Sequence, residues 1–190
     1  MQVIRNASIV LALGFVFSGA MAGEIANSTV TSTNASNTSA GLSSSARQNI
    51  GVAEQSGRIA NSSVTVNGAS NTAAGLSSTA TQNVGRATDK GQIINSTVVG
   101  SNLRNTAAGL SSTATQEVGF AKNNGLVQNS TVRVNGASNL AAGLSASALQ
   151  QIGGAQGNGK LTNSTVVATG SSNTAAGLMS SASQSIGVAK

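Results

Sequence analysis

Hydrophobic and polar positions in this chain recur every 34 residues, in five successive copies and without a gap. A valine follows an Asn-Ser pair at residues 30, 64, 98, 132 and 166. A Gly-Leu pair recurs at residues 41–42, 75–76, 109–110, 143–144 and 177–178. Exact spacing of this kind is typical of repeat architectures. Because insertions disturb stacked coils but not beads on a flexible string, the absence of gaps favours a solenoid.

Within each copy, constant and variable positions alternate. Among the even positions of residues 72–84, Ala74, Leu76, Ala80 and Gln82 hold the same residue in every copy. Odd positions such as 81 and 83 vary, and both charged residues of this stretch in any copy, Arg47 and Glu117, occupy them. A period of two predicts a β-strand with one buried face. We therefore expect the constant residues, Leu76 and Gln82 among them, to face inward and the variable residues to face solvent.

A helix is the alternative interpretation of the same stretch. Several apolar residues also fall three or four positions apart, but Gly75 and the surrounding serines and threonines are poor helix formers. A helix would also not hold Gln82 constant while its two neighbours vary. A second, shorter strand is expected from Ile59 to Val66. Turns are expected at the Gly- and Asn-containing segments 67–71, 88–91, 122–125, 135–139 and 156–159.

Composition explains how such a chain can fold. Only 7% of the residues are charged and 2% are aromatic, and Cys, His, Pro, Trp and Tyr are absent. A core of large apolar side chains is therefore not available, and no disulfide can replace it. If each copy forms one coil, identical residues stack at the interstrand spacing of about 4.8 Å, and side-chain amides can hydrogen-bond along the axis. The sequence thus predicts an all-β fold, a β-solenoid of five 34-residue repeats with one coil per repeat and cross-β-like stacking.

Four structural ladders, built from three residue types, are expected along this solenoid. The glutamine ladder consists of Gln48, Gln82, Gln116, Gln150 and Gln184. The first asparagine ladder consists of Asn27, Asn61, Asn95, Asn129 and Asn163. The second asparagine ladder consists of Asn37, Asn71, Asn105, Asn139 and Asn173. The leucine ladder consists of Leu42, Leu76, Leu110, Leu144 and Leu178.

The first 22 residues differ from the rest of the chain. Arg5 precedes an apolar run at residues 7–19, and Ala20-Met21-Ala22 supplies a cleavage pattern of small residues. This order predicts a secretory signal peptide, cut before Gly23. A membrane anchor is the alternative, but the run is shorter than the roughly 20 residues that span a bilayer. Residues 23–190 then form one secreted repeat domain, with copies at 25–58, 59–92, 93–126, 127–160 and 161–190.

The residue inventory excludes most chemistry. Without Cys or His the chain can build no zinc site and no Cys-His or Ser-His-Asp centre, so we expect no enzyme activity, no catalytic residue, no metal and no cofactor. The formal net charge is +6, yet the cations occupy scattered repeat positions without stacking aromatics. Specific nucleic-acid binding is therefore not expected, although loose adsorption of extracellular DNA or polysaccharide stays open. Each Asn-Ser-Thr/Ser triplet also matches the N-glycosylation sequon, while its stacked position suggests a structural role.

The segments "NSSVTVNGASNTAAGL" and "ATQNVGRA" resemble the repeats of bacterial functional amyloids, the curli and Fap fibre subunits. The resemblance covers the chain after residue 22 and lies in pattern. It implies a homopolymer that grows end to end in biofilm matrix or surface adhesion. Its partners would be a fibre nucleator and an outer-membrane secretion channel, with no stable membrane insertion. Because copies one and five lack atypical flanking repeats, we expect uncapped ends that serve as templates for strand pairing.

Two other functions remain open from the sequence. Thr79, Thr81, Thr113 and Thr115 form Thr-x-Thr pairs of the kind found on flat ice-binding faces, although Arg47 and Leu149 interrupt the array. A monomeric adhesin or a fibre nucleator would use the same solenoid without forming the main body of a fibre.

Overall fold

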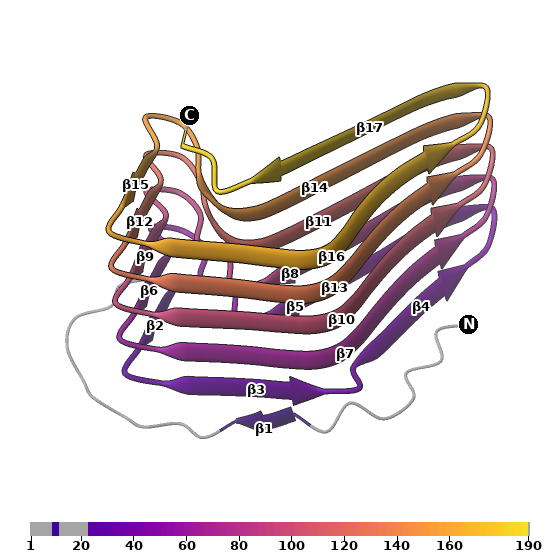
Figure 1. Ribbon diagram of the computed structural model, residues 1–190. Helices are drawn as coiled ribbons and strands as arrows, with labels where there is room; N and C mark the ends of the chain where they lie inside the picture. The colour runs from indigo at the N-terminus through magenta and orange to yellow at the C-terminus, as the bar shows by residue number, and fades with distance from the viewer. Residues whose placement is uncertain (1–8, 12–22, 190) are drawn as a thin grey trace.

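The computed structural model describes residues 9–11 and 23–189 of the chain. Five coils wind around one axis, and each coil contributes strands to three parallel sheets (Figure 1). The described residues contain no helix. This confirms the prediction of an all-β solenoid with one coil per repeat.

The short-strand sheet consists of β2 (Glu24–Ala26), β6 (Arg58–Ala60), β9 (Gln92–Ile94), β12 (Leu126–Gln128) and β15 (Lys160–Thr162). The parallel strands of the long-strand sheet are β3 (Thr29–Thr33), β4 (Ser36–Ala40), β7 (Ser63–Ala74), β10 (Thr97–Ala108), β13 (Thr131–Ala142) and β16 (Thr165–Ala176). The return sheet consists of β5 (Ser43–Ile50), β8 (Ser77–Val84), β11 (Ser111–Ala121), β14 (Ser145–Ala155) and β17 (Met179–Ile186). Residues paired between these parallel strands are 34 apart, as in Val98 with Val132 and Gln116 with Gln150.

The predicted signal peptide, residues 1–22, lies outside the described residues apart from β1 (Ile9–Leu11). This strand pairs antiparallel with β3 at the indigo end of the stack in Figure 1. Removal of residues 1–22 would leave that edge of β3 without its partner.

Each coil changes direction where the backbone adopts positive φ. The corner between the short and long strands is an asparagine, for example Asn61 with φ 49°. Halfway along, the long strand bends at Gly68 or its equivalents, of which Asn102 has φ 52° (Figure 1). The segments 67–71 and 135–139, expected as turns, are therefore bends inside continuous strands. Positive φ suits glycine and asparagine, which explains their recurrence at these sites.

The prediction of one strand through residues 72–84 is wrong, as is that of a shorter second strand from Ile59 to Val66. The chain reverses at Gly75 and Leu76, between β7 and β8, so the inward parity changes from odd to even positions. A β-carbon on Gly75 would lie 1.6 Å from the carbonyl oxygen of Gly41 in the preceding coil. Only glycine permits this stacked turn, and the equivalent Gly109 and Gly143 are placed in the same way.

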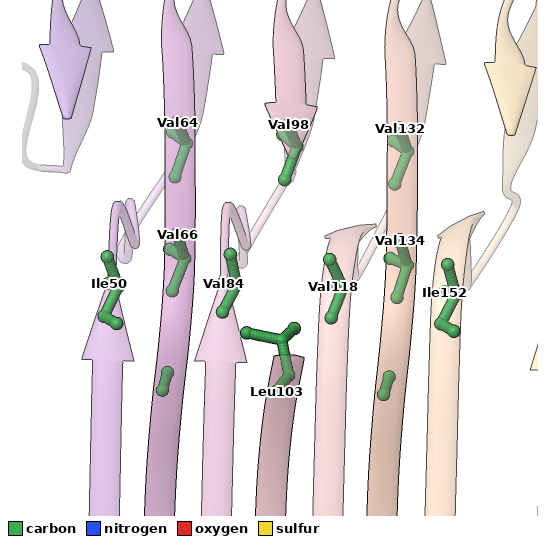
Figure 2. Close-up of a cluster of buried hydrophobic side chains, with 12 residues drawn as sticks. Ile50, Val64, Val66, Val84, Val98, Leu103, Val118, Val132, Val134 and Ile152 are labelled. Atoms are coloured by element: carbon green, nitrogen blue, oxygen red, sulfur yellow. The ribbon is translucent and has the colours of Figure 1, made fainter. Parts of the chain in front are cut away.

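Small and medium side chains fill the interior in three separate columns. Ile50, Val64, Val84 and their equivalents pack between the first half of the long-strand sheet and the end of the return sheet (Figure 2). Alanines such as Ala73 and Ala80 fill the narrow space between the second half of the long-strand sheet and the return sheet. Ile59, Ile93 and Val127 pack with alanines behind the short-strand sheet. Such tight spacing explains why the interior needs little aromatic bulk, although Phe120, 3% exposed, is buried there.

Candidate functional site: the two ends of the solenoid

Two columns of side-chain amides run through the interior. The structure places the glutamine ladder on the inward face of the return sheet, where Gln82, Gln116 and Gln150 are 0% exposed. It places the ladder of Asn37, Asn71, Asn105, Asn139 and Asn173 on the inward face of the long-strand sheet, with the middle members almost fully buried. Neighbouring amides hydrogen-bond within both columns. A buried polar group otherwise costs about 1–3 kcal/mol when left unpaired.

The asparagine column donates toward the C-terminal end. Asn71 Nδ2 donates to Asn105 Oδ1 over 2.8 Å, and the same direction holds in every step from Asn37 to Asn173. Asn71 Nδ2 also lies 3.0 Å from the carbonyl oxygens of Ala46 and Thr81 in the return sheet. Since carbonyls only accept, these contacts fix which side of the amide carries the hydrogens. The column therefore has a defined polarity and also joins two sheets.

The glutamine column donates in the opposite direction. Gln116 Nε2 donates to Gln82 Oε1 over 2.7 Å, and Gln82 Nε2 donates to Gln48 Oε1 over 2.8 Å. Gln184 Nε2 donates to Gln150 Oε1 in the last coil. Contact between Gln82 Nε2 and the carbonyl oxygen of Ala69, at 3.2 Å, orients this amide too. The two amide columns are thus antiparallel in donor direction.

This arrangement leaves complementary groups at the two ends. Within the described residues, Gln48 Nε2 finds no acceptor and Asn37 Oδ1 finds no donor at the N-terminal end. At the C-terminal end, Gln184 Oε1 has no donor among them, and Asn173 Nδ2 bonds only backbone carbonyls. In each column, the terminal donor at one end of the solenoid therefore matches the terminal acceptor at the other end.

Among the described residues, the backbone edges of the return and short-strand sheets are also open at these ends. Strands β5 and β17 are the edges of the return sheet, and β2 and β15 are the edges of the short-strand sheet. All but one of the residues of β17 are exposed. An exposed edge of this kind presents unpaired backbone groups to any further strand.

The first asparagine ladder lies at exposed corners. Asn27, Asn61, Asn95, Asn129 and Asn163 have φ between 48° and 49°. One amide contact joins them among the described residues, from Asn95 Nδ2 to Asn61 Oδ1 at 3.2 Å. The adjacent serines do more to join the coils. Ser96 Oγ donates a hydrogen bond to the carbonyl oxygen of Ile94 over 2.7 Å and accepts one from the backbone amide of Ser62 in the preceding coil. These serines were not among the predicted ladders, although their strict 34-residue recurrence marks them.

The leucine ladder does not face inward, so this expectation is wrong. Leu42, Leu76, Leu110, Leu144 and Leu178 are 50–86% exposed. They follow the stacked glycines at the turn between the long-strand and return sheets, where the side chain points out of the coil. The constant Ala74 is likewise only partly buried, because Ala73 fills the interior instead.

Glu117 also departs from its expected place. Its side chain is 2% exposed, with Arg86 Nε 2.8 Å from Oε2 and Lys122 Nζ beside Oε1. These contacts are ion pairs, and neither oxygen accepts a hydrogen bond of normal geometry. The segment after Gly85 folds back beside the outer face of the return sheet, and Arg86 and Thr88 line the same groove of about 420 Å³ as Asn83. That folding buries a position whose variability suggested solvent.

The described residues hold no cluster of three or more His, Cys, Asp or Glu side chains that could bind a metal ion. They also hold no helix long and apolar enough to cross a bilayer. Comparison of the chain with protein-family models, with curated proteins and with solved structures finds no match.

Proposed function

We propose that this chain is a secreted structural protein that assembles end to end into extracellular amyloid-like fibres. The observation that carries the proposal is the match between the two ends. In a head-to-tail pair, Gln48 of one copy would donate to Gln184 Oε1 of the other, and Asn173 would donate to Asn37 Oδ1. The register of 34 residues would continue across the junction.

Burial supports the same direction of growth. Among the described residues, the inward side chains of the last coil have no layer above them: Ile186 is 43% exposed, whereas the equivalent Ile152 is 0% exposed. A second copy stacked on β16 and β17 would cover them. Apolar burial and completed amide columns would then both stabilise the junction.

Purified chain without residues 1–22 should form unbranched fibres whose diffraction contains a meridional reflection at about 4.7–4.8 Å. Fibres of this kind, in biofilm matrix or on surfaces, would involve a nucleator and an outer-membrane secretion channel as partners. A chain that stays monomeric at high concentration with its solenoid intact would contradict the proposal.

Ice binding is the second candidate, and one observation favours it. Thr79 pairs with Thr113 and Thr81 with Thr115 on the outer face of the return sheet. The array of threonine pairs extends over only two coils, since Arg47 and Leu149 occupy the equivalent position in the flanking coils. Thermal hysteresis from the monomer, with loss of activity in Thr81→Lys, would support this function in place of assembly.

A further inference from the structure

The exposed leucines form a continuous apolar ridge along one edge of the solenoid. The leucine ridge consists of Leu42, Leu76, Leu110, Leu144 and Leu178, one residue per coil. Successive coils are in parallel register through this edge, so the leucines rise by one strand spacing, about 4.8 Å. Single exposed apolar residues are ordinary, but an unbroken row of them indicates an interaction surface.

Charge is absent from the whole edge. Residues 37–46, 71–80, 105–114, 139–148 and 173–182 surround the ridge and contain no Asp, Glu, Lys or Arg. The chain as a whole has a formal net charge of +6, and Arg47 and Arg104 lie just outside these segments. Two copies with the same positive charge can therefore approach along this edge without bringing cations together. An anionic partner would find nothing here to bind.

Periodicity restricts the occupant further. A partner that contacts all five leucines needs apolar groups at the same axial repeat, and a second copy carries that repeat by construction. We propose that the leucine ridge is the lateral interface through which two copies of this solenoid pair side by side. The middle leucine, Leu110, would meet its equivalent whether the two in-register copies run parallel or antiparallel.

Area determines when this pairing becomes stable, and this step rests on the proposed function. Five leucines, three of them only about half exposed, present far less than the roughly 800 Å² per partner of a stable complex. End-to-end assembly makes the ridge continuous, so the contact area grows with fibre length. Solenoids should therefore pair firmly as fibres and only transiently as monomers.

The test compares two triple variants of the chain without residues 1–22. The ridge variant carries Leu76→Gln, Leu110→Gln and Leu144→Gln. The control carries Thr79→Gln, Thr113→Gln and Ser147→Gln, at exposed positions of the neighbouring outer face. Mass per unit length by scanning transmission electron microscopy should correspond to two solenoids for the unmodified chain and the control, and should fall twofold for the ridge variant. Elongation rates should agree within about twofold, because the ends are unchanged. A ridge variant with the full mass per length, or unmodified fibres one solenoid wide, would overturn the proposal.

If the chain forms no fibres, end-to-end assembly fails but the ridge can still be decided in solution. The chain has no cysteine, so Leu110→Cys places a single thiol on the ridge and Thr113→Cys places one beside it. Under mild oxidation, transient pairing should trap the disulfide-linked dimer of Leu110→Cys at least fivefold faster than that of Thr113→Cys. Equal trapping rates would refute lateral pairing through the ridge.

Discussion

At the scale of single residues, the third coil distributes side-chain volume between two nearby core positions differently from the second and fourth coils. Val66 and Ala69 in the second coil, like Val134 and Ala137 in the fourth, correspond to Gly100 and Leu103 in the third. A β-carbon on Gly100 would lie 2.7 Å from Leu103 Cδ1, so Leu103 occupies the space that a valine would fill (Figure 2). Both combinations contain the same number of side-chain carbon atoms. From the second to the fourth coil, the core therefore conserves volume rather than residue identity at these two positions.

This exchange predicts a strongly coupled pair of substitutions. Leu103→Ala alone should lower the free energy of unfolding by about 2–5 kcal/mol, because it leaves a cavity beside Gly100. Gly100→Val alone should cost about 1–3 kcal/mol through overlap with Leu103. The double variant reproduces the second and fourth coils and should recover most of the loss. Urea denaturation of all four proteins gives the coupling energy, and additive effects would contradict the compensation.

Other residue positions show where sequence patterns reach their limit. Recurrence every 34 residues identified the buried glutamines and asparagines correctly as stacked columns, since only a partner in the next coil satisfies an inward amide. It could not place Glu117, because variability at a position does not reveal that Arg86 of the preceding coil and Lys122 of the same coil pack against it.

At the scale of the strand, one glycine decides which residues face inward. Period-two alternation predicts a strand, but it predicts which residues face inward only as far as the next turn. The turn at Gly75 lies within a stretch that alternates on both sides of it, so the pattern does not reveal this turn. Constancy among copies had suggested burial for Leu76, yet a residue can also be kept constant on the surface. Fold class was therefore predictable from the sequence, whereas strand boundaries and the direction of the leucines were not.

The glutamine column joins strands of the return sheet, and its contribution can be measured. Gln116→Leu should leave Gln82 Oε1 and Gln150 Nε2 without their partners in the interior. The free energy of unfolding should fall by about 2 kcal/mol or more, as expected for buried polar groups that lose hydrogen bonds.

Thr115→Leu is the matched control, because it introduces the same side chain on the adjacent outward position, where the next coil already has Leu149. Its urea midpoint should stay close to that of the unmodified chain. Similar losses in both variants would mean that the inward amides add little to stability.

At the scale of the whole molecule, the antiparallel donor directions of the two amide columns give the solenoid a chemical polarity. Its N-terminal end offers a donor on the glutamine column and an acceptor on the asparagine column, and its C-terminal end offers the reverse. In a head-to-tail pair, each terminal donor meets an acceptor of the same residue type, and the strands continue in parallel register. We therefore expect head-to-tail growth, and interfering with one terminal amide should be enough to slow it.

Gln48→Glu tests this directly. Within the chain Gln48 only accepts, from Gln82 Nε2, so a carboxylate keeps that bond and the solenoid should stay folded. At a junction the same carboxylate would face Gln184 Oε1, acceptor against acceptor, and at pH 7 elongation should slow at least tenfold. Below the usual glutamate pKa of about 4.3 the protonated carboxyl can donate, so elongation should recover. Asn49→Asp adds the same charge on the outer face of β5 and keeps the contact with Asn83 Nδ2, so it should elongate normally at both pH values. Equal slowing of the two variants at pH 7, or no recovery of Gln48→Glu in acid, would show that junctions form without the glutamine column.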